Sequence, residues 1–335
     1  MFKPHRIRVV HSHRISPNFQ RVTFRGVDDL GPAGPVRDLR VKLIIPGAAG
    51  LPELDAEGNW FEQWRSLDAE HRGHARTYSI RNLRRGDSSA PAEVDIDFVI
   101  HADAPGPASA WAAAAQPGDE LYLIGPRADD DSGAGIEFVP QQATSIVMLG
   151  DETALPAIAK TLQEWPSGAS GRVFVEIPEL ADKQELELPD GVTLQWLPRS
   201  EFERERGRRE AVVKPGELLV EALEAYLLHA AGAEPAEHTA QAATPPAAGD
   251  AEVSDAEISE SGHLVWETPT FSSGGAELTA TSPKTAGAFA DSYFWIAGEA
   301  GSVVQMRRLL VGRWEIPRSQ VSFMGYWKQG LAARG

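Results

Sequence analysis

The segment Arg76-Thr77-Tyr78-Ser79-Ile80-Arg81 decides how this 335-residue sequence is interpreted. Side chains alternate along a strand, so Arg76 and Tyr78 share one face while Thr77 and Ser79 share the other. A guanidinium donates two charge-assisted hydrogen bonds in one plane, which suits a diphosphate, and a tyrosine ring can lie against a flat heterocycle. A small hydroxyl nearby can bond to a ring nitrogen. Taken alone, the segment fits a surface strand with a barrel-packing tyrosine at least as well.

Short β-rich runs surround this segment and are separated by Gly, Pro and Asp clusters. The clearest run is 93–101, where Val94, Ile96, Phe98 and Ile100 occupy alternate positions. Many short strands with no helix between most of them predict a small antiparallel barrel. We therefore expect an antiparallel Greek-key β-barrel domain over residues 1–140. The other strand candidates are residues 6–10, 19–25, 39–45 and 119–125.

A different pattern begins near residue 143, where apolar strand-like runs alternate with segments of helical spacing. Such alternation predicts an open parallel sheet. The fold class is therefore two-domain, β plus α/β, with the second domain over residues 141–335. The strand candidates are 144–150, 172–177, 192–197 and 293–297, and the helix candidates are 154–165, 216–230 and 301–311.

The stretch from about residue 232 to 283 is rich in Ala, Pro, Glu, Thr and Ser, and is predicted to be an acidic low-complexity insertion. Only its apolar island His263–Trp266 is expected to dock. Between Lys214 and Lys284 there are twelve acids and no Lys or Arg. Removing their charge of −12 from the net −16 leaves about −4 elsewhere. A basic cleft is therefore permitted, while broad nucleic-acid binding is not supported.

The sequence contains no cysteine, which excludes disulfides, thiolate catalysis and cysteine-ligated metal centres. Redox chemistry would have to come from an organic cofactor or from iron carried by a substrate. His11, His13, His71 and His74 form no persuasive ligand set, so no metal site is expected.

The beginning of the chain is polar, and no apolar stretch of the length of a signal sequence or membrane span follows Met1–Arg6. We expect a soluble cytoplasmic protein that does not bind membranes, and a monomer.

Several strings occur in one order along the chain, and as a set they resemble the siderophore-interacting proteins, which are ferredoxin-reductase-like flavoproteins. The matching pieces extend over residues 6–330, and only the acidic insertion lies outside the pattern. The strings are Arg76–Ser79, His101, Gly106–Trp111, Pro117–Asp119, Gly150–Ile158, Trp295–Gly301 and Gly325–Gly330.

This resemblance implies an FAD site on the barrel. Arg76 would hold the FAD diphosphate, Tyr78 would stack on the isoalloxazine and Ser79 would lie near flavin N5, with Thr77 completing the motif. A helix that begins near residue 108 would present free N–H groups to the anion. The other FAD-site residues implied are Asp97, Val99, His101, Gly106, Ala108 and Ser109.

The turn Gly150-Asp151-Glu152-Thr153 follows a strand and opens a helix, but no G-x-G-x-x-G fingerprint is present. A plain helix cap explains the two acids, since the helix dipole favours negative charge there. Because the acids would repel a pyrophosphate, the turn could also face neutral rings, so that Asp151, Thr153 and Ala154 border the nicotinamide and the flavin. The nicotinamide cofactor's phosphates would then lie over Gly298 and Glu299.

Residues for the choice of donor and for the substrate are less clearly marked. Glu176 could accept ribose hydroxyls, which favours NADH, whereas Arg199 could meet a 2′-phosphate, which favours NADPH. The family's substrate cleft is basic, and Arg127 and Lys328 are candidates to bind an anionic ferric siderophore. Solvated loop cations explain these two residues equally well.

The expected function is a reductase that passes electrons from NADH or NADPH through FAD to a ferric siderophore and releases Fe(II). No side chain is nominated as a general acid or base. Two alternatives remain: a general flavin reductase or ferredoxin-linked electron-transfer protein, and a non-catalytic carrier that only binds the siderophore.

Overall fold

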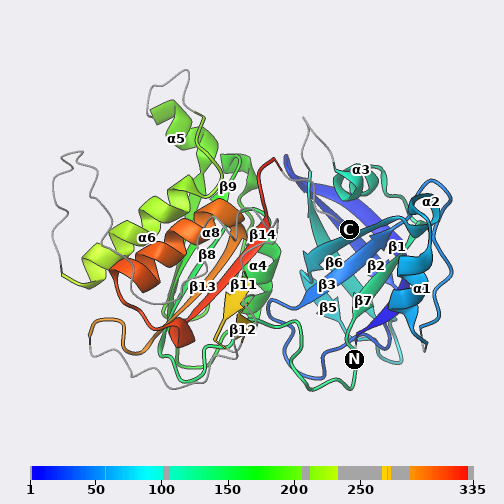
Figure 1. Cartoon of the computed structure of the whole chain (residues 1–335), viewed down its shortest axis with the longest axis horizontal. Helices are drawn as coiled ribbons and strands as arrows, with labels where there is room; N and C mark the ends of the chain where they lie inside the picture. The colour runs from blue at the N-terminus through cyan, green and yellow to red at the C-terminus, as the bar shows by residue number, and fades with distance from the viewer. Residues whose placement is uncertain are drawn as a thin grey trace.

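The computed structural model describes residues 2–56, 58–100, 106–205, 212–232, 266–269, 271–272 and 287–330. They form a barrel from the first part of the chain and a layered α/β unit from the second, side by side (Figure 1). This arrangement confirms the predicted two-domain β plus α/β class. The predicted boundary at residue 140 falls in the segment 126–144, which connects the two sheets.

Seven antiparallel strands make the barrel, in the order β4-β3-β7-β1-β2-β6-β5. β4 and β5 lie at opposite ends of this order, yet only Ile80 and Arg81 separate them in the chain. The sheet therefore curls until its ends meet, and the N–H of Arg81 donates to the carbonyl of Asp95 on β6. The strands are β1 (Lys3–Ser16), β2 (Phe19–Arg25), β3 (Arg40–Ile45), β4 (His74–Ser79), β5 (Asn82–Arg84), β6 (Glu93–Val99) and β7 (Glu120–Gly125).

The barrel core follows the predicted alternation on β6, where Ile96 and Phe98 are fully buried. Asp95 and Asp97 on the opposite face are buried as well, because Arg84 and Arg21 form ion pairs with them. Three short helices complete the barrel: α1 (Trp60–Ser66) and α2 (Ala69–Arg72) between β3 and β4, and α3 (Pro107–Ala114) between β6 and β7.

The second sheet has the order β10-β9-β8-β13-β14-β11-β12. Its first five strands are parallel, which confirms the predicted open parallel sheet. The antiparallel hairpin of β11 (Trp266–Thr268) and β12 (Phe271–Ser272) is an addition that was not predicted. The parallel strands are β8 (Ser145–Gly150), β9 (Ser170–Ile177), β10 (Val192–Pro198), β13 (Ser292–Glu299) and β14 (Val321–Trp327).

The hairpin lies inside the stretch predicted to be a low-complexity insertion. Its first residue, Trp266, docks on β14, as expected for the apolar island. The other three residues of that island, His263–Val265, lie outside the described residues, as does most of the stretch 232–283.

Helices cover both faces of the parallel sheet. Val147 and Leu149 of β8 pack in one core with α6 and α8, whereas Ile146 and Met148 pack in another with α4. α4 therefore lies between the sheet and the barrel, as Figure 1 shows. The helices are α4 (Leu155–Gln163), α5 (Arg199–Glu205), α6 (Glu217–Ala230) and α8 (Ala300–Arg307), with the 3₁₀ turns η1 (Leu180–Asp182) and η3 (Arg318–Gln320) and the π-helical turn η2 (Arg308–Arg313).

Polar contacts join the two bodies. The indole N–H of Trp295 on β13 donates to Asp38 over 2.8 Å, in the buried interior. The side chain of Tyr326 on β14 lies close to Ser79, the last residue of β4. The end of β4 therefore lies at the interface between the barrel and the α/β unit.

Candidate functional site

The β4 strand presents the motif of the sequence in the expected alternation. Tyr78 is half-buried and its ring centroid lies 4.6 Å from that of Phe98, while Ser79 is buried. Arg76 is partly exposed, and its guanidinium donates to the carbonyl of Ala75. Burial raises the pKa of Tyr78, so the phenol is neutral at ordinary pH. A cation and a neutral aromatic ring thus share one face of β4.

The helix α3 begins after Gly106, which is its N-cap. Because Gly106 has no side chain, no side-chain oxygen of the N-cap accepts from the first turn of the helix. Pro107 is the first helical residue, and Ala108 and Ser109 are buried. A side chain at Gly106 would meet no atom within 4 Å, so there is open space at this terminus. The first turn of α3 therefore suits an anion. His101 lies outside the described residues.

Asp97 and Val99 lie on β6, which faces the same region. Both carboxylate oxygens of Asp97 accept from Arg21, at 2.6 and 2.8 Å, and the side chain is completely buried. The carboxylate of Asp97 is thus paired with Arg21, and its contact with the cofactor stays a prediction. Val99 is half-buried and paired with Phe19.

The ends of β8 and β13 form the point of the second sheet where the strand order reverses. Gly150 and Ala297 are direct neighbours in the sheet. The chain then leaves β8 for α4 on one face and leaves β13 for α8 on the other. In open α/β sheets, ligands bind in the crevice outside such a switch point.

Asp151 organises this switch point from a fully buried position. One carboxylate oxygen accepts from the N–H and hydroxyl of Thr153, at 2.9 and 2.6 Å. The other accepts from the backbone N–H of Glu299 at 2.8 Å and from the indole of Trp327 at 2.7 Å. Burial, together with the nearby Glu152, raises the pKa of Asp151 to about 7. The plain helix-cap prediction is wrong, because α4 has Ala154 as its N-cap and no acid in its first turn, and Asp151 instead bonds to Thr153 in the turn before the helix. This turn lies where a ligand is expected.

Gly298 and Glu299 have related roles at the end of β13. Gly298 has a φ of +147°, and a Cβ there would lie 2.6 Å from an oxygen of Asp151. Glu299 is the N-cap of α8 and accepts from Ser302 N–H at 3.0 Å. Ala154, also predicted at this site, is buried at the start of α4.

Two family models match the chain: the siderophore-interacting FAD-binding domain over residues 8–130, and the siderophore-interacting protein over residues 143–330. The chain belongs to the siderophore-interacting protein family. The two matches divide between the barrel and the α/β unit, so each half of the candidate site lies within one of them.

Two proteins named as ferric reductases are similar to this chain. Ferric vibriobactin reductase ViuB of Vibrio cholerae is 32% identical over 198 residues, which cover 58% of this chain and 67% of ViuB. The NADPH-dependent ferric-chelate reductase of Escherichia coli is 33% identical over 202 residues, which cover 58% of this chain and 71% of that protein.

Solved structures share the whole arrangement. A siderophore utilization protein from T. fusca is 27% identical with a TM-score of 0.62, covering 100% of this chain and 96% of that one. The siderophore-interacting protein SipS from Aeromonas hydrophila is 26% identical with a TM-score of 0.55, covering 98% of this chain and 99% of that one. The ferredoxin reductase of carbazole 1,9a-dioxygenase, at 12% identity and a TM-score of 0.54, covers 97% of this chain and 70% of that one and shares the fold.

The structure contradicts both predictions about the choice of donor, namely Glu176 for NADH and Arg199 for NADPH. The guanidinium of Arg199 donates to Glu152 at 2.9 Å and to Glu176 at 2.8 Å. The Glu176 carboxylate is completely buried and also accepts from the N–H groups of Gly216 and Leu218. These side chains are committed to one another, so Glu176 is not placed to bind a ribose and Arg199 is not placed to bind a 2′-phosphate.

The two predicted substrate cations lie in different settings. Lys328 follows β14 directly and is half-buried beside the switch point, one residue after Trp327. Arg127 lies in a loop of the barrel, 3.8 Å from Asp29 and 3.4 Å from Asp129, which partly neutralise its charge.

Sequence reasoning missed two cations on β3, Arg40 and Lys42, which are paired in register with Ser79 and Thr77 of β4. Loss of surrounding water and then the charge of Arg40 lower the pKa of Lys42. The signal was available, because Arg40 and Lys42 alternate with the apolar Leu39, Val41 and Leu43.

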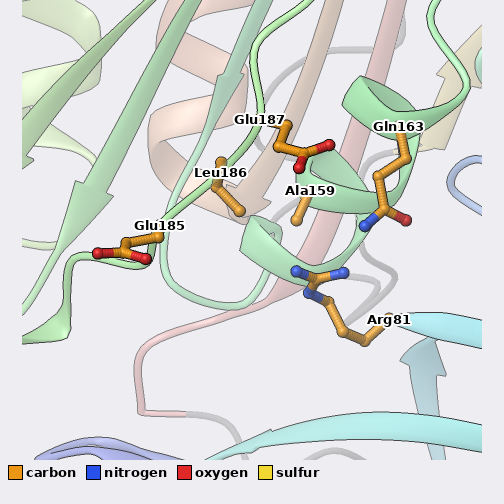
Figure 2. A pocket seen from close by; sticks show the side chains of 6 residues that line it. All are labelled: Arg81, Ala159, Gln163, Glu185, Leu186 and Glu187. Atoms are coloured by element: carbon orange, nitrogen blue, oxygen red, sulfur yellow. The ribbon is translucent and has the colours of Figure 1, made fainter.

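A cavity of about 250 Å³ lies between the barrel and α4. Figure 2 shows the guanidinium of Arg81 extending from the barrel toward α4, with Glu187 on the far side. The cavity is lined by one cation, Arg81, and two acids, Glu185 and Glu187, so it does not favour an anionic ligand. The lining residues are Arg81, Ala159, Gln163, Glu185, Leu186 and Glu187.

Two further searches covered only the part of the chain that the structure describes. In it, no three His, Asp or Glu side chains gather as they would around a metal ion. Nor does any helix in these ranges have the length and apolar character that crossing a membrane requires.

Proposed function

We propose that this chain is a flavin-dependent reductase that passes electrons from NADPH or NADH through FAD to the iron of a ferric siderophore. The observation that carries the proposal is that the side chain of Tyr326 lies close to Ser79. Through it, the FAD motif on β4 touches the strand that leads to the switch point of the α/β sheet. The nicotinamide and the flavin must bind next to each other, because hydride transfer requires direct contact between their rings.

The residues of the barrel fit FAD. Arg76 and the first turn of α3 supply a cation and backbone donors for a diphosphate. Tyr78, backed by Phe98, supplies a flat neutral surface for a ring system. Ser79 supplies a hydroxyl at the edge of that surface. The match of residues 8–130 to an FAD-binding domain supports this assignment.

When bound, FAD supplies the ability to accept two electrons together and to pass them on singly. One NADPH therefore reduces two Fe(III) ions to Fe(II) and releases one proton. The chain's own contribution is to orient the two cofactors and to attract the substrate. Lys328 and Lys42 would hold an anionic ferric complex near the interface. No side chain has to transfer a proton.

The names of similar proteins support both ends of this electron path. One relative is a ferric vibriobactin reductase and another is an NADPH-dependent ferric-chelate reductase. We propose NADPH or NADH as the donor, a ferric siderophore as the acceptor, and the cytoplasm as the place of reaction, with the chain acting as a monomer.

An anaerobic half-reaction experiment tests the proposal. The FAD-loaded protein is reduced with one equivalent of NADPH and separately of NADH, and the bleaching of flavin absorbance is recorded. Ferric siderophore is then added with an Fe(II)-trapping chelator. Reoxidation of the flavin with two Fe(II) formed per NADPH is expected.

The same experiment separates the alternatives. Protein that binds no flavin after FAD is added would rule out both reductase hypotheses and leave the siderophore carrier. Protein whose flavin is reduced by NADPH but is not reoxidised by the ferric complex would identify a flavin reductase with another acceptor.

A further inference from the structure

Trp266, from the stretch predicted to be an insertion, is anchored in the α/β sheet. It begins β11 and pairs with Met324 of β14, while the next residue pairs with Phe323. Glu267 also forms an ion pair with Arg307 of α8 at 2.9 Å, and both side chains are largely buried. Strand pairing and this ion pair together attach β11 to β14 and α8.

The indole of Trp266 lies between the barrel and the α/β unit. Its ring is stacked on Tyr326, with centroids 6.1 Å apart and planes inclined by 12°. The guanidinium carbon of Arg40 on β3 lies 4.2 Å from the centroid of the same indole. Both contacts are attractive, the first through stacking and the second through the charge of Arg40 above the ring.

These contacts close into a ring of four residues. Tyr326, stacked on Trp266, lies close to Ser79. Ser79 in turn is the register partner of Arg40 on the neighbouring strand. We call Arg40, Trp266, Tyr326 and Ser79 the four-residue ring. Each member comes from a different strand, and two come from each body of the molecule.

We propose that Trp266 is a positioning residue for the electron-transfer site: by holding Tyr326 against Ser79, it fixes the two half-sites relative to each other. The inference rests on the proposed function. It assigns to the inserted stretch a role at the interface, although Trp266 and Glu267 belong neither to the FAD motif nor to the switch point. Trp266 itself need not touch either cofactor.

The expected effect is on the rate of flavin reduction. Trp266→Ala removes both the stack and the cation–π contact, so Tyr326 and the interface gain freedom. We expect FAD reduction by saturating NADPH to slow by about tenfold, since orientation of the reacting rings is lost. FAD affinity should stay within about twofold of the original protein, because Arg76, Tyr78 and α3 are untouched. Trp266→Phe keeps an aromatic ring and should restore most of the rate.

Trp60→Ala is the matched control. Trp60 is also a half-buried tryptophan, but it lies on α1, where its indole donates to the carbonyl of Phe2. Stopped-flow reduction of all variants is compared with their thermal unfolding. A rate unchanged in Trp266→Ala, or slowed equally in Trp60→Ala, overturns the inference. A faster rate also overturns it, since Trp266 would then obstruct the site.

A readout without cofactor gives an independent check. In the flavin-free protein, the stacked Trp266–Tyr326 pair should contribute a near-ultraviolet circular dichroism signal that Trp266→Ala loses and Trp60→Ala retains. Arg40→Gln combined with Trp266→Ala should slow flavin reduction no more than Trp266→Ala alone, because both changes break the same ring. Additive effects would contradict a shared ring. If NADPH fails to reduce the flavin of the unmodified protein, the proposed function has failed instead.

Discussion

The indole N–H of Trp327 donates to Oδ2 of Asp151 over 2.7 Å, and this bond ties the end of β14 to the turn after β8. The same oxygen accepts the backbone N–H of Glu299 at the end of β13. One buried carboxylate therefore connects three strand ends of the parallel sheet. Because all of these donors are internal, we expect Asp151 to shape the switch point rather than to react with a ligand.

Gly298→Ala should damage this connection. The added methyl group would lie 2.6 Å from Oδ2 of Asp151, at a residue with a φ of +147°. We expect a loss of about 2–4 kcal/mol in the free energy of unfolding, measured in urea. Gly312→Ala, at a position with no atom within 4 Å, serves as the control and should change stability by less than about 1 kcal/mol. Equal losses in both variants would contradict this account.

Asp38 should make stability depend on pH. Burial raises its pKa to about 6, although the Trp295 indole and two backbone N–H groups donate to it. A carboxyl with a raised folded pKa stabilises the fold most below its unfolded pKa of about 4 and loses that contribution as pH rises through 6. The difference in unfolding free energy between the original protein and Asp38→Asn should therefore fall by about 3 kcal/mol from pH 4 to pH 7. Parallel pH profiles would show that Asp38 titrates normally.

Glu176→Ala should be strongly destabilising. It leaves the largely buried Arg199 with one partner fewer and removes the acceptor of two backbone N–H groups. The expected loss is about 3–5 kcal/mol in chemical denaturation. Glu224→Ala removes a more exposed acid paired with Arg313 and should cost at most about 1 kcal/mol. If Glu176→Ala folds normally and selectively weakens NADH binding, the ribose interpretation regains its place.

Arg76→Ala should weaken FAD binding by about tenfold to a hundredfold, since a charge-assisted pair of hydrogen bonds to the diphosphate is lost. Titration of flavin fluorescence with the flavin-free protein measures the change. Arg65→Ala, an exposed arginine on α1, is the matched control and should bind FAD normally. Unchanged affinity in Arg76→Ala would remove Arg76 from the FAD site.

Lys42→Ala and Lys328→Ala should each raise KM for the ferric siderophore by about fivefold to tenfold, because each removes a positive charge near an anionic substrate. Flavin reduction by NADPH, measured separately, should keep its rate. The exposed Lys214, beside the start of α6, gives the control Lys214→Ala. Equal KM values in all of these variants would place the substrate elsewhere.

Local patterns predicted the parts of the molecule that depend on local chemistry. The alternation in 93–101 predicted β6, and the change of period near residue 143 predicted the parallel sheet. The Arg76–Ser79 motif predicted the face that Arg76 and Tyr78 share, because side-chain direction in a strand follows from the backbone alone.

The rest depended on partners distant in sequence. Glu176 and Arg199 were predicted to bind a nucleotide because the residues adjacent to them in sequence do not show that Glu152 and Glu176 both pair with Arg199. Trp266 docks on β14 because Tyr326 and Arg40 are placed there by two different sheets. A pattern limited to neighbouring residues contains no such information, so these contacts could not be predicted from it.

The two sheets also differ in how much of the chain each one needs. Every strand of the barrel comes from residues 3–125, whereas β8 pairs with β13 through residues as distant as Ser145 and Ser292. Contacts between distant residues form slowly, because a long loop must close first. During synthesis, domains nearer the beginning of a chain fold first. We therefore expect the barrel to be complete while the ribosome is still translating the second sheet, so that the nascent chain can take up its flavin early.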